Sequence, residues 1–178
     1  MYEQGTRVVS TSSTTGRGST TGEVDPRGQR FAAALTAVVL VVALVAAPSV
    51  LTVVLLTVQL AVFALGAFVG PASTPYAWLF RTVVRPRLGP PAETEDARPP
   101  RFAQAVGLGF AAVALVGYAL DVTLLGAIAA GMALAAAFLN ATVGFCLGCE
   151  MYLLIKRVTT NRAGNALGPM HHPERTTT

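Results

Sequence analysis

The hydrophobic pattern of the chain divides it into two long apolar runs separated by a polar centre. Residues 31–80 contain no Asp, Glu, Lys or Arg, and residues 102–149 contain only Asp121. A hydrocarbon core of roughly 30 Å requires about 20 apolar residues per helix, so each run is long enough to cross a membrane twice. Apolar and polar residues do not alternate as they would in a membrane β-barrel. The pattern therefore predicts an all-α membrane protein.

Each apolar run has one interruption near its middle. Pro48 lacks an N–H group and disfavours helix in the residue before it, so the chain can reverse there. Asp121 interrupts the second run, and a lone carboxylate is costly at mid-membrane but tolerated at an interface. We therefore predict four transmembrane helices paired as two tight helical hairpins, at residues 30–47, 50–70, 102–120 and 122–143.

Polar segments flank and separate the two hairpins. Residues 1–24 are rich in Ser, Thr and Gly, and residues 158–178 are polar and punctuated by Gly and Pro, so both are predicted to be disordered. Residues 25–157 would form the transmembrane domain, with a loop at 71–101. An aromatic, basic, amphipathic stretch follows the second helix (YAWLFRTVVRP) and another follows the fourth (EMYLLIKR). We expect both stretches to lie at the membrane surface.

Composition and charge agree with a membrane protein and indicate its orientation. The chain has 178 residues, of which 53% are hydrophobic and only 12% charged, which is unusual for a soluble domain. Its basic residues lie in the N-terminal segment, the central loop and the C-terminal segment, and neither hairpin tip has any. The positive-inside rule then places both termini and the central loop of this multi-pass protein on the cytoplasmic side of an inner (cytoplasmic) membrane. Because the arginines are spread over three segments without interleaved aromatics, we expect lipid headgroups and no nucleic acid as partners.

The two hairpins show short similarities to one another. Arg30-Phe31-Ala32 opens the first hairpin, and Arg101-Phe102-Ala103 opens the second. Farther along, GAFVGP at 66–71 resembles GFCLGC at 144–149. These matches are consistent with a tandem repeat of two copies in the same orientation, and also with coincidence among small apolar residues.

Two glycine pairs predict close helix packing. Gly66 with Gly70, and Gly144 with Gly148, stand four positions apart. On a helix this spacing places both glycines on one face, where another backbone can approach closely. The isolated polar residues Gln59, Gln104, Tyr118 and Asn140 are predicted to form hydrogen bonds across helix interfaces.

Cys146 and Cys149, three positions apart in GFCLGCEMYLLIKR, are the candidate catalytic residues. Two cysteines so spaced share a helix face, and a helix start lowers a thiol pKa. The pair could instead lie late in a helix, and the carboxylate of Glu150 beside Cys149 would raise the thiol pKa. Because the pair is predicted to face a reducing cytoplasm, a cycling dithiol or sulfur acceptor is favoured over a permanent disulfide. The alternative is that the two cysteines are only small residues that allow helices to pack.

Other chemistries find little support in the sequence. Cys146, Cys149, His171 and His172 could supply four zinc ligands, but adjacent histidines do not match the usual spacing of zinc sites. We therefore predict neither a metal nor a cofactor. The motifs of P-loop ATPases, zinc proteases and serine hydrolases do not occur. Apart from Arg30 at the start of the first span, no charged residue lies within a predicted span, which argues against a proton-coupled transporter.

Several segments together resemble a known family. DPRGQRFAA at 25–33, PPRFAQAVG at 99–107 and above all GFCLGCEMYLL at 144–154 are similar to the bacterial membrane proteins grouped as domain of unknown function 4395. The resemblance implies no established activity. Proteins of this family are often encoded beside thioredoxin-like and rhodanese-type sulfurtransferase proteins. It implies Cys146 and Cys149 as functional residues, with Glu150 and Tyr152 as neighbours.

Three hypotheses follow for the function. The first is thiol–disulfide exchange or sulfur relay by the Cys146–Cys149 dithiol with a soluble thioredoxin-like or rhodanese-type partner. The second is a structural subunit that assembles a larger membrane complex through its glycine faces and has no chemistry. The third is a transporter of small solutes or sulfur compounds, which for four helices would require a homo-oligomer.

Overall fold

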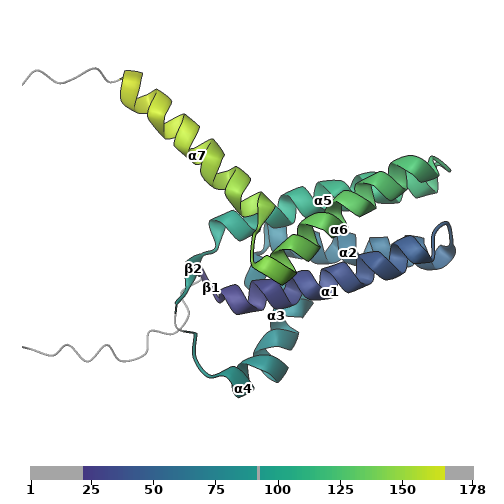
Figure 1. Cartoon of the computed structure of the whole chain (residues 1–178), viewed down its shortest axis with the longest axis horizontal. Coiled ribbons are helices and arrows are strands. Elements are labelled where there is room, and N and C mark those ends of the chain that lie inside the picture. The colour runs from purple at the N-terminus through teal and green to yellow at the C-terminus, as the bar shows by residue number, and fades with distance from the viewer. Residues whose placement is uncertain (1–21, 92, 167–178) are drawn as a thin grey trace, which may run out of the picture.

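The computed structural model describes residues 22–91 and 93–166 and is almost entirely helical (Figure 1). Within these residues, four helices are long and apolar enough to cross a membrane: α1 (Pro26–Val45), α2 (Val50–Phe68), α5 (Arg98–Ala119) and α6 (Thr123–Val143). The protein is thus an all-α, multi-pass membrane protein by the length and composition of its helices.

Two of the four observed spans begin earlier than the apolar runs alone predict. The largest differences are at α1 and α5, which begin at Pro26 and Arg98 where residues 30 and 102 were expected. Each helix starts within the polar flank, because proline is well tolerated in the first turn of a helix. At α1 the Asp25 side chain also accepts a hydrogen bond from the backbone N–H of Arg27 and caps the helix.

The chain turns at both interruptions of its apolar runs. Pro48 follows a cis peptide bond between α1 and α2, and the Ser49 side chain caps α2 by accepting from the Thr52 backbone N–H. Asp121 lies between α5 and α6 with a φ of 59°, a conformation that Asp tolerates better than most residues. Both turns lie at one end of the bundle, opposite the starts of α1 and α5 (Figure 1).

The four long helices form a ring in which each contacts two others. Contacts join α1 to α2, α2 to α5, α5 to α6 and α6 to α1. The most extensive contacts are those of α1 with α6 and of α2 with α5, so packing between consecutive helices is only part of the structure. The core of the bundle is built around Leu40, Leu56, Ala114 and Ala130, which are at most 1% exposed.

The backbones of α5 and α6 touch near the Asp121 turn. A Cβ atom added to Gly117 of α5 would lie 2.6 Å from the backbone nitrogen of Gly126 in α6. The hydrophobic effect contributes little to contacts between helices in lipid. Small residues stabilise such a crossing because they allow close van der Waals packing of the two backbones. This contact therefore depends on the absence of a side chain at Gly117.

The flanking segments contain more structure than their composition predicts. Glu23–Val24 (β1) pairs antiparallel with Glu95–Asp96 (β2), so the end of segment 1–24 and the central loop each contribute a short strand. Leu147–Ala166 (α7) continues through residues 158–166, which were expected to be disordered; the stretch 158–163 has neither Gly nor Pro to end a helix. The remaining disorder predictions, for residues 1–21 and 167–178, lie outside the described residues.

Short helices occupy the loop after α2. They are η1 (Pro71–Ser73), α3 (Pro75–Leu79), the π-helical η2 (Phe80–Val84) and α4 (Arg85–Leu88). This segment packs back on the bundle through Phe80, which is 3% exposed and lies against the start of α1. The arginines at 81, 85 and 87 remain exposed.

We predict that Gly117→Ala and Gly109→Ala, two changes in the same helix, have opposite effects on stability. A Cβ at Gly109 meets open space, so the better helix propensity of Ala should leave stability unchanged or raise it by about 0.5–1 kcal/mol. A Cβ at Gly117 collides with the Gly126 backbone and should cost about 1–3 kcal/mol. Thermal unfolding in detergent micelles measures both; equal stability of the two variants would contradict this backbone contact.

Candidate functional site

The two cysteines lie where α6 ends and α7 begins. Gly144 follows the last residue of α6 with a φ of 73°, and its backbone N–H donates to the Asn140 carbonyl at 3.0 Å. This left-handed glycine stops α6. The chain restarts as α7 at Leu147, and the Glu150 backbone N–H donates to the Cys146 carbonyl at 3.0 Å. Cys146 therefore occupies the N-cap position of α7, and the pair lies at a helix start.

The sulfur of Cys146 serves as the cap of α7. The backbone N–H of Cys149 donates to Cys146 Sγ at 3.3 Å, the bond that a Ser or Asp side chain usually accepts at this position. The two sulfur atoms are bonded as a disulfide, with Cα atoms 5.2 Å apart. After reduction, the same N–H group and the positive end of the α7 dipole would favour a thiolate at Cys146.

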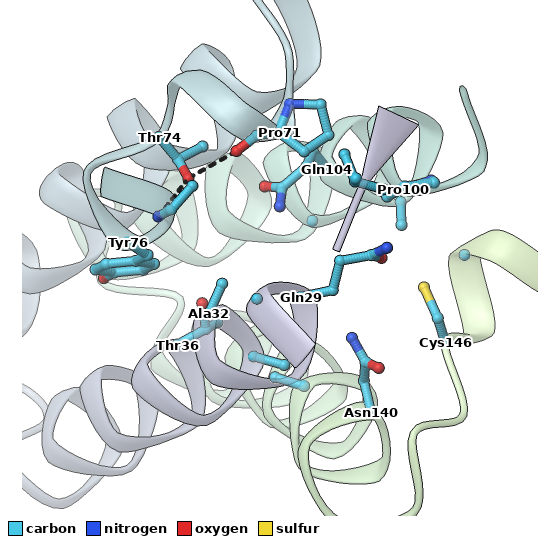
Figure 2. A pocket seen from close by; sticks show the side chains of 18 of the residues that line it. Gln29, Ala32, Thr36, Pro71, Thr74, Tyr76, Pro100, Gln104, Asn140 and Cys146 are labelled. Carbon is cyan, nitrogen blue, oxygen red and sulfur yellow. Dashed lines mark hydrogen bonds between the residues drawn. The ribbon is translucent and has the colours of Figure 1, made fainter. Parts of the chain in front are cut away.

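Cys146 also forms part of the wall of a central cavity of about 600 Å³. All four long helices line this cavity, and α3, η2 and α7 close part of it. Figure 2 shows Gln29, Asn140 and Cys146 directed toward the same space. The Ala-rich face of α6 creates much of the room, through Ala133, Ala136 and Ala137.

A buried polar network lies beside the cavity. Tyr76 Oη donates to Gln59 Oε1 at 3.0 Å, and Gln59 Nε2 donates to Thr36 Oγ1 at 3.3 Å. Gln59 is completely buried, so both bonds satisfy groups that would otherwise be costly. Burial raises the pKa of Tyr76 further above neutral pH, so its phenol remains a hydrogen-bond donor. The predicted interhelical hydrogen bond of Gln59 is confirmed.

Gln104 presents an amide oxygen without a hydrogen-bond partner among the described residues. Its Oε1 atom is buried, and the side chain lies at the cavity (Figure 2). Gly66 of α2 makes room for it, because a Cβ there would lie 2.8 Å from the Gln104 side chain. Gly66 therefore accommodates a cavity-lining amide, and not the backbone of another helix.

The prediction that each glycine pair forms one helical face is wrong. Gly70, with a φ of 136°, lies beyond the end of α2, and Gly144 lies beyond the end of α6. In each pair a positive φ places one glycine in a turn. Gly66 and Gly148 are the two that pack closely, and a Cβ on Gly148 would lie 2.6 Å from the Ala103 Cα atom of α5.

Two arginines bind the ends of neighbouring helices in a similar way, one of them beside the cysteines. Arg30 of α1 donates to the carbonyls of Ala141 and Thr142 at the end of α6. Arg101 of α5 donates to the carbonyls of Ala67 and Phe68 at the end of α2. A guanidinium at a helix C-terminus satisfies its free carbonyls and complements its dipole. Each arginine thus joins a helix start to the end of the neighbouring helix.

The aromatic residue after each arginine makes a similar contact. The Phe31 and Phe80 ring centroids are 5.7 Å apart, and those of Phe102 and Tyr152 are 5.9 Å apart. Phe80 belongs to the segment after α2, and Tyr152 belongs to α7 after α6. The short sequence match at Arg30 and Arg101 therefore corresponds to equivalent contacts in the two halves.

A second, smaller hollow reaches the cysteines from another side. It has about 340 Å³ and is lined by both cysteines, Glu150, Arg30 and residues from the β2 region. Glu150 is exposed. Cys146 lines both the hollow and the central cavity, whereas Cys149 lines only the hollow.

The zinc hypothesis cannot be built from the described part of the chain. Residues 22–91 and 93–166 contain no group of three or more His, Cys, Asp or Glu placed to hold a metal ion. His171 and His172 lie outside these residues.

Similarity to a family model identifies the family of the chain. Residues 24–157 match the family model described as Domain of unknown function (DUF4395). The chain belongs to this family. The match confirms the resemblance carried by GFCLGCEMYLL. No curated protein and no solved structure is detectably similar to the chain. The description of the family assigns no activity.

Sequence reasoning did not identify the cavity residues Thr36 and Tyr76, or the role of Gln104 beside them. A usable signal existed for Gln104, since an amide isolated in an apolar helix needs a partner or a polar space. Thr36 offered little signal, because threonine is common in membrane helices, where its hydroxyl can bond to its own backbone.

We predict that Gly148→Ala moves the start of α7 away from α5. The added Cβ would collide with the Ala103 backbone, which cannot rotate aside. Because Cys146 lies at the same helix start, its reduced thiol should react several-fold faster with a bulky maleimide. Mass spectrometry of the labelled protein measures this rate. Gly131→Ala is the control because it adds a Cβ in open space; identical rates in both variants would contradict the contact.

Proposed function

We propose that the protein is an inner-membrane thiol–disulfide exchange protein that acts through Cys146 and Cys149. The observation that carries the proposal is the Cys146 sulfur at the N-cap of α7, which accepts the Cys149 backbone N–H. A cysteine in this position is favoured as a thiolate, the reactive form in disulfide exchange. The second cysteine already lies within bonding distance of it.

The two cysteines would have different roles. The Cys146 thiolate attacks a disulfide of the partner, forms a mixed disulfide and releases one partner thiolate. The Cys149 thiolate then attacks Cys146 Sγ, forms the intramolecular disulfide and releases the second partner thiolate. The reverse sequence reduces the Cys146–Cys149 disulfide. The partner is a soluble thioredoxin-like or rhodanese-type protein. With the latter, the Cys146 thiolate would attack the outer sulfur of the partner's persulfide, break its S–S bond, form a persulfide on Cys146 and release the partner's thiolate.

The distribution of charge supports a cytoplasmic location for the pair. Both turns of the bundle lie at one end, and the basic residues of the described chain lie at the other end or in α7. With the positive side inside, the termini, the loop and the cysteines face the cytoplasm. The two halves are helical hairpins of one repeated unit, which the equivalent contacts of Arg30 and Arg101 support.

Two other functions compete with this proposal. One is a subunit that only packs within a larger membrane complex, although the close contacts at Gly117 and Gly148 lie within this chain and not on a surface offered to a partner. The central cavity would suit a transporter of small solutes, working as a homo-oligomer. Neither function requires a sulfur atom at a helix cap.

We predict that only one single-cysteine variant traps a partner. Reduced Cys149→Ser protein retains the capped Cys146 thiol, so it should form a stable mixed disulfide with an oxidised thioredoxin-like protein. Cys146→Ser should trap at least about tenfold less, because Cys149 lies inside the helix and lacks the N-cap environment. Non-reducing gel electrophoresis separates the adducts. Equal trapping would contradict distinct roles for the two cysteines, stronger trapping by Cys146→Ser would reverse the roles, and no trapping by either variant would refute exchange.

We further predict that the thiols are accessible from the cytoplasm. In reduced, inside-out membrane vesicles a membrane-impermeant maleimide should label wild-type protein, whereas the Cys146→Ser/Cys149→Ser double variant stays unlabelled. In right-side-out vesicles neither protein should react. Labelling from the periplasmic side alone would overturn the topology without bearing on the chemistry of the pair.

A further inference from the structure

The central cavity lies inside the membrane-spanning bundle and borders one cysteine of the proposed redox pair. Cys146 lies in its wall, and α1, α2, α5 and α6 supply most of the other lining residues. Its volume of about 600 Å³ falls within the range of about 300–1,000 Å³ that small-molecule sites occupy. The space is therefore large enough for a cyclic ligand next to the sulfur.

The lining indicates the chemistry of such a ligand. The part supplied by the long helices consists of apolar residues with amide and hydroxyl groups among them, notably Thr36, Gln104 and Asn140. The charged lining residues belong to the flanking segments around β1, η2, and α4. An anion or a cation would find no opposite charge deep in this cavity, so the ligand is neutral.

We propose that the cavity binds a membrane quinone, which exchanges electrons with the Cys146–Cys149 pair; this rests on the proposed function of the pair as a redox dithiol. A quinone is neutral, planar and soluble in the bilayer, and it carries two carbonyl oxygens. Amide NH₂ groups at Gln104 and Asn140 are suitable donors to these oxygens. Gln104 also carries a buried Oε1 atom that has no partner within the described structure, and this acceptor suits an O–H group of the hydroquinone product.

The reaction balances in electrons and protons. From the reduced pair, the two S–H bonds break and the Cys146–Cys149 S–S bond forms. The two electrons and two protons released convert the quinone into a hydroquinone. The new disulfide then oxidises a dithiol on the soluble partner, which reaches the cysteines through the smaller hollow that both of them line. The central cavity and the hollow thus give Cys146 access to two different reactants.

The test uses the full chain in lipid nanodiscs, reduced and freed of reductant under anaerobic conditions. Decylubiquinone is added, its reduction is followed by absorbance, and remaining thiols are counted by maleimide labelling. Wild-type protein should reduce one quinone per cysteine pair and lose both thiols. Cys146→Ser/Cys149→Ser protein should reduce none. If reduced wild-type protein keeps its thiols in the presence of the quinone, the proposal is refuted.

Variants in the cavity locate the site. Ala137→Phe fills the space and should abolish quinone reduction, while exchange with a soluble thioredoxin-like protein is retained and shows that the variant is folded. Gln104→Leu should slow quinone reduction about tenfold through the loss of one buried hydrogen bond. Thr57→Val is the matched control, because Thr57 is exposed on α2 and donates to its own helix. Wild-type rates in both cavity variants would overturn the site.

The two proposals fail in different ways. If the protein exchanges disulfides with the soluble partner but does not reduce the quinone, the proposed function stands and the quinone site is wrong. If the quinone oxidises the pair but no soluble partner does, the quinone site stands and the soluble exchange is wrong.

Discussion

The interruption of the helix between Val143 and Leu147 is the constraint on which the site depends. An uninterrupted helix through this segment would bury the Cys149 N–H in an ordinary backbone hydrogen bond. Gly144 ends α6 instead, and its left-handed conformation turns the chain so that Cys146 becomes the first residue before α7. The sulfur then receives a backbone N–H and lies at the positive end of a helix dipole.

Contacts from both halves of the molecule hold this interruption in place. Arg30 reaches from α1 to the last carbonyls of α6, and Gly148 lets the first turn of α7 lie against the backbone of α5. Arg101 makes the corresponding contact at the end of α2, so similar contacts occur in both halves of the chain. The loop after α2 has no cysteine, so the dithiol is an addition to this shared frame.

The sequence predicts the four spans well and the geometry around the cysteines poorly, for physical reasons. Charge-free runs identify the four spans because lipid tolerates little else, and Pro48 and Asp121 mark the turns. Gly144 is different: a glycine in an apolar segment can support helix packing or end a helix, and its spacing from Gly148 suits both. The alanines of α6 present the same ambiguity, since small residues allow close contact at Ala130 and leave the cavity open at Ala137.

The reduction potential of the Cys146–Cys149 pair, measured in lipid nanodiscs against thiol–disulfide buffers, is the most direct test of a helix-capped redox dithiol. A working pair titrates in a single two-electron step within the range of known exchange proteins, roughly −270 to −120 mV. A potential below about −300 mV, typical of a structural disulfide, would contradict the redox role of the site. Two thiols that form no disulfide at any buffer potential would contradict the redox role as well.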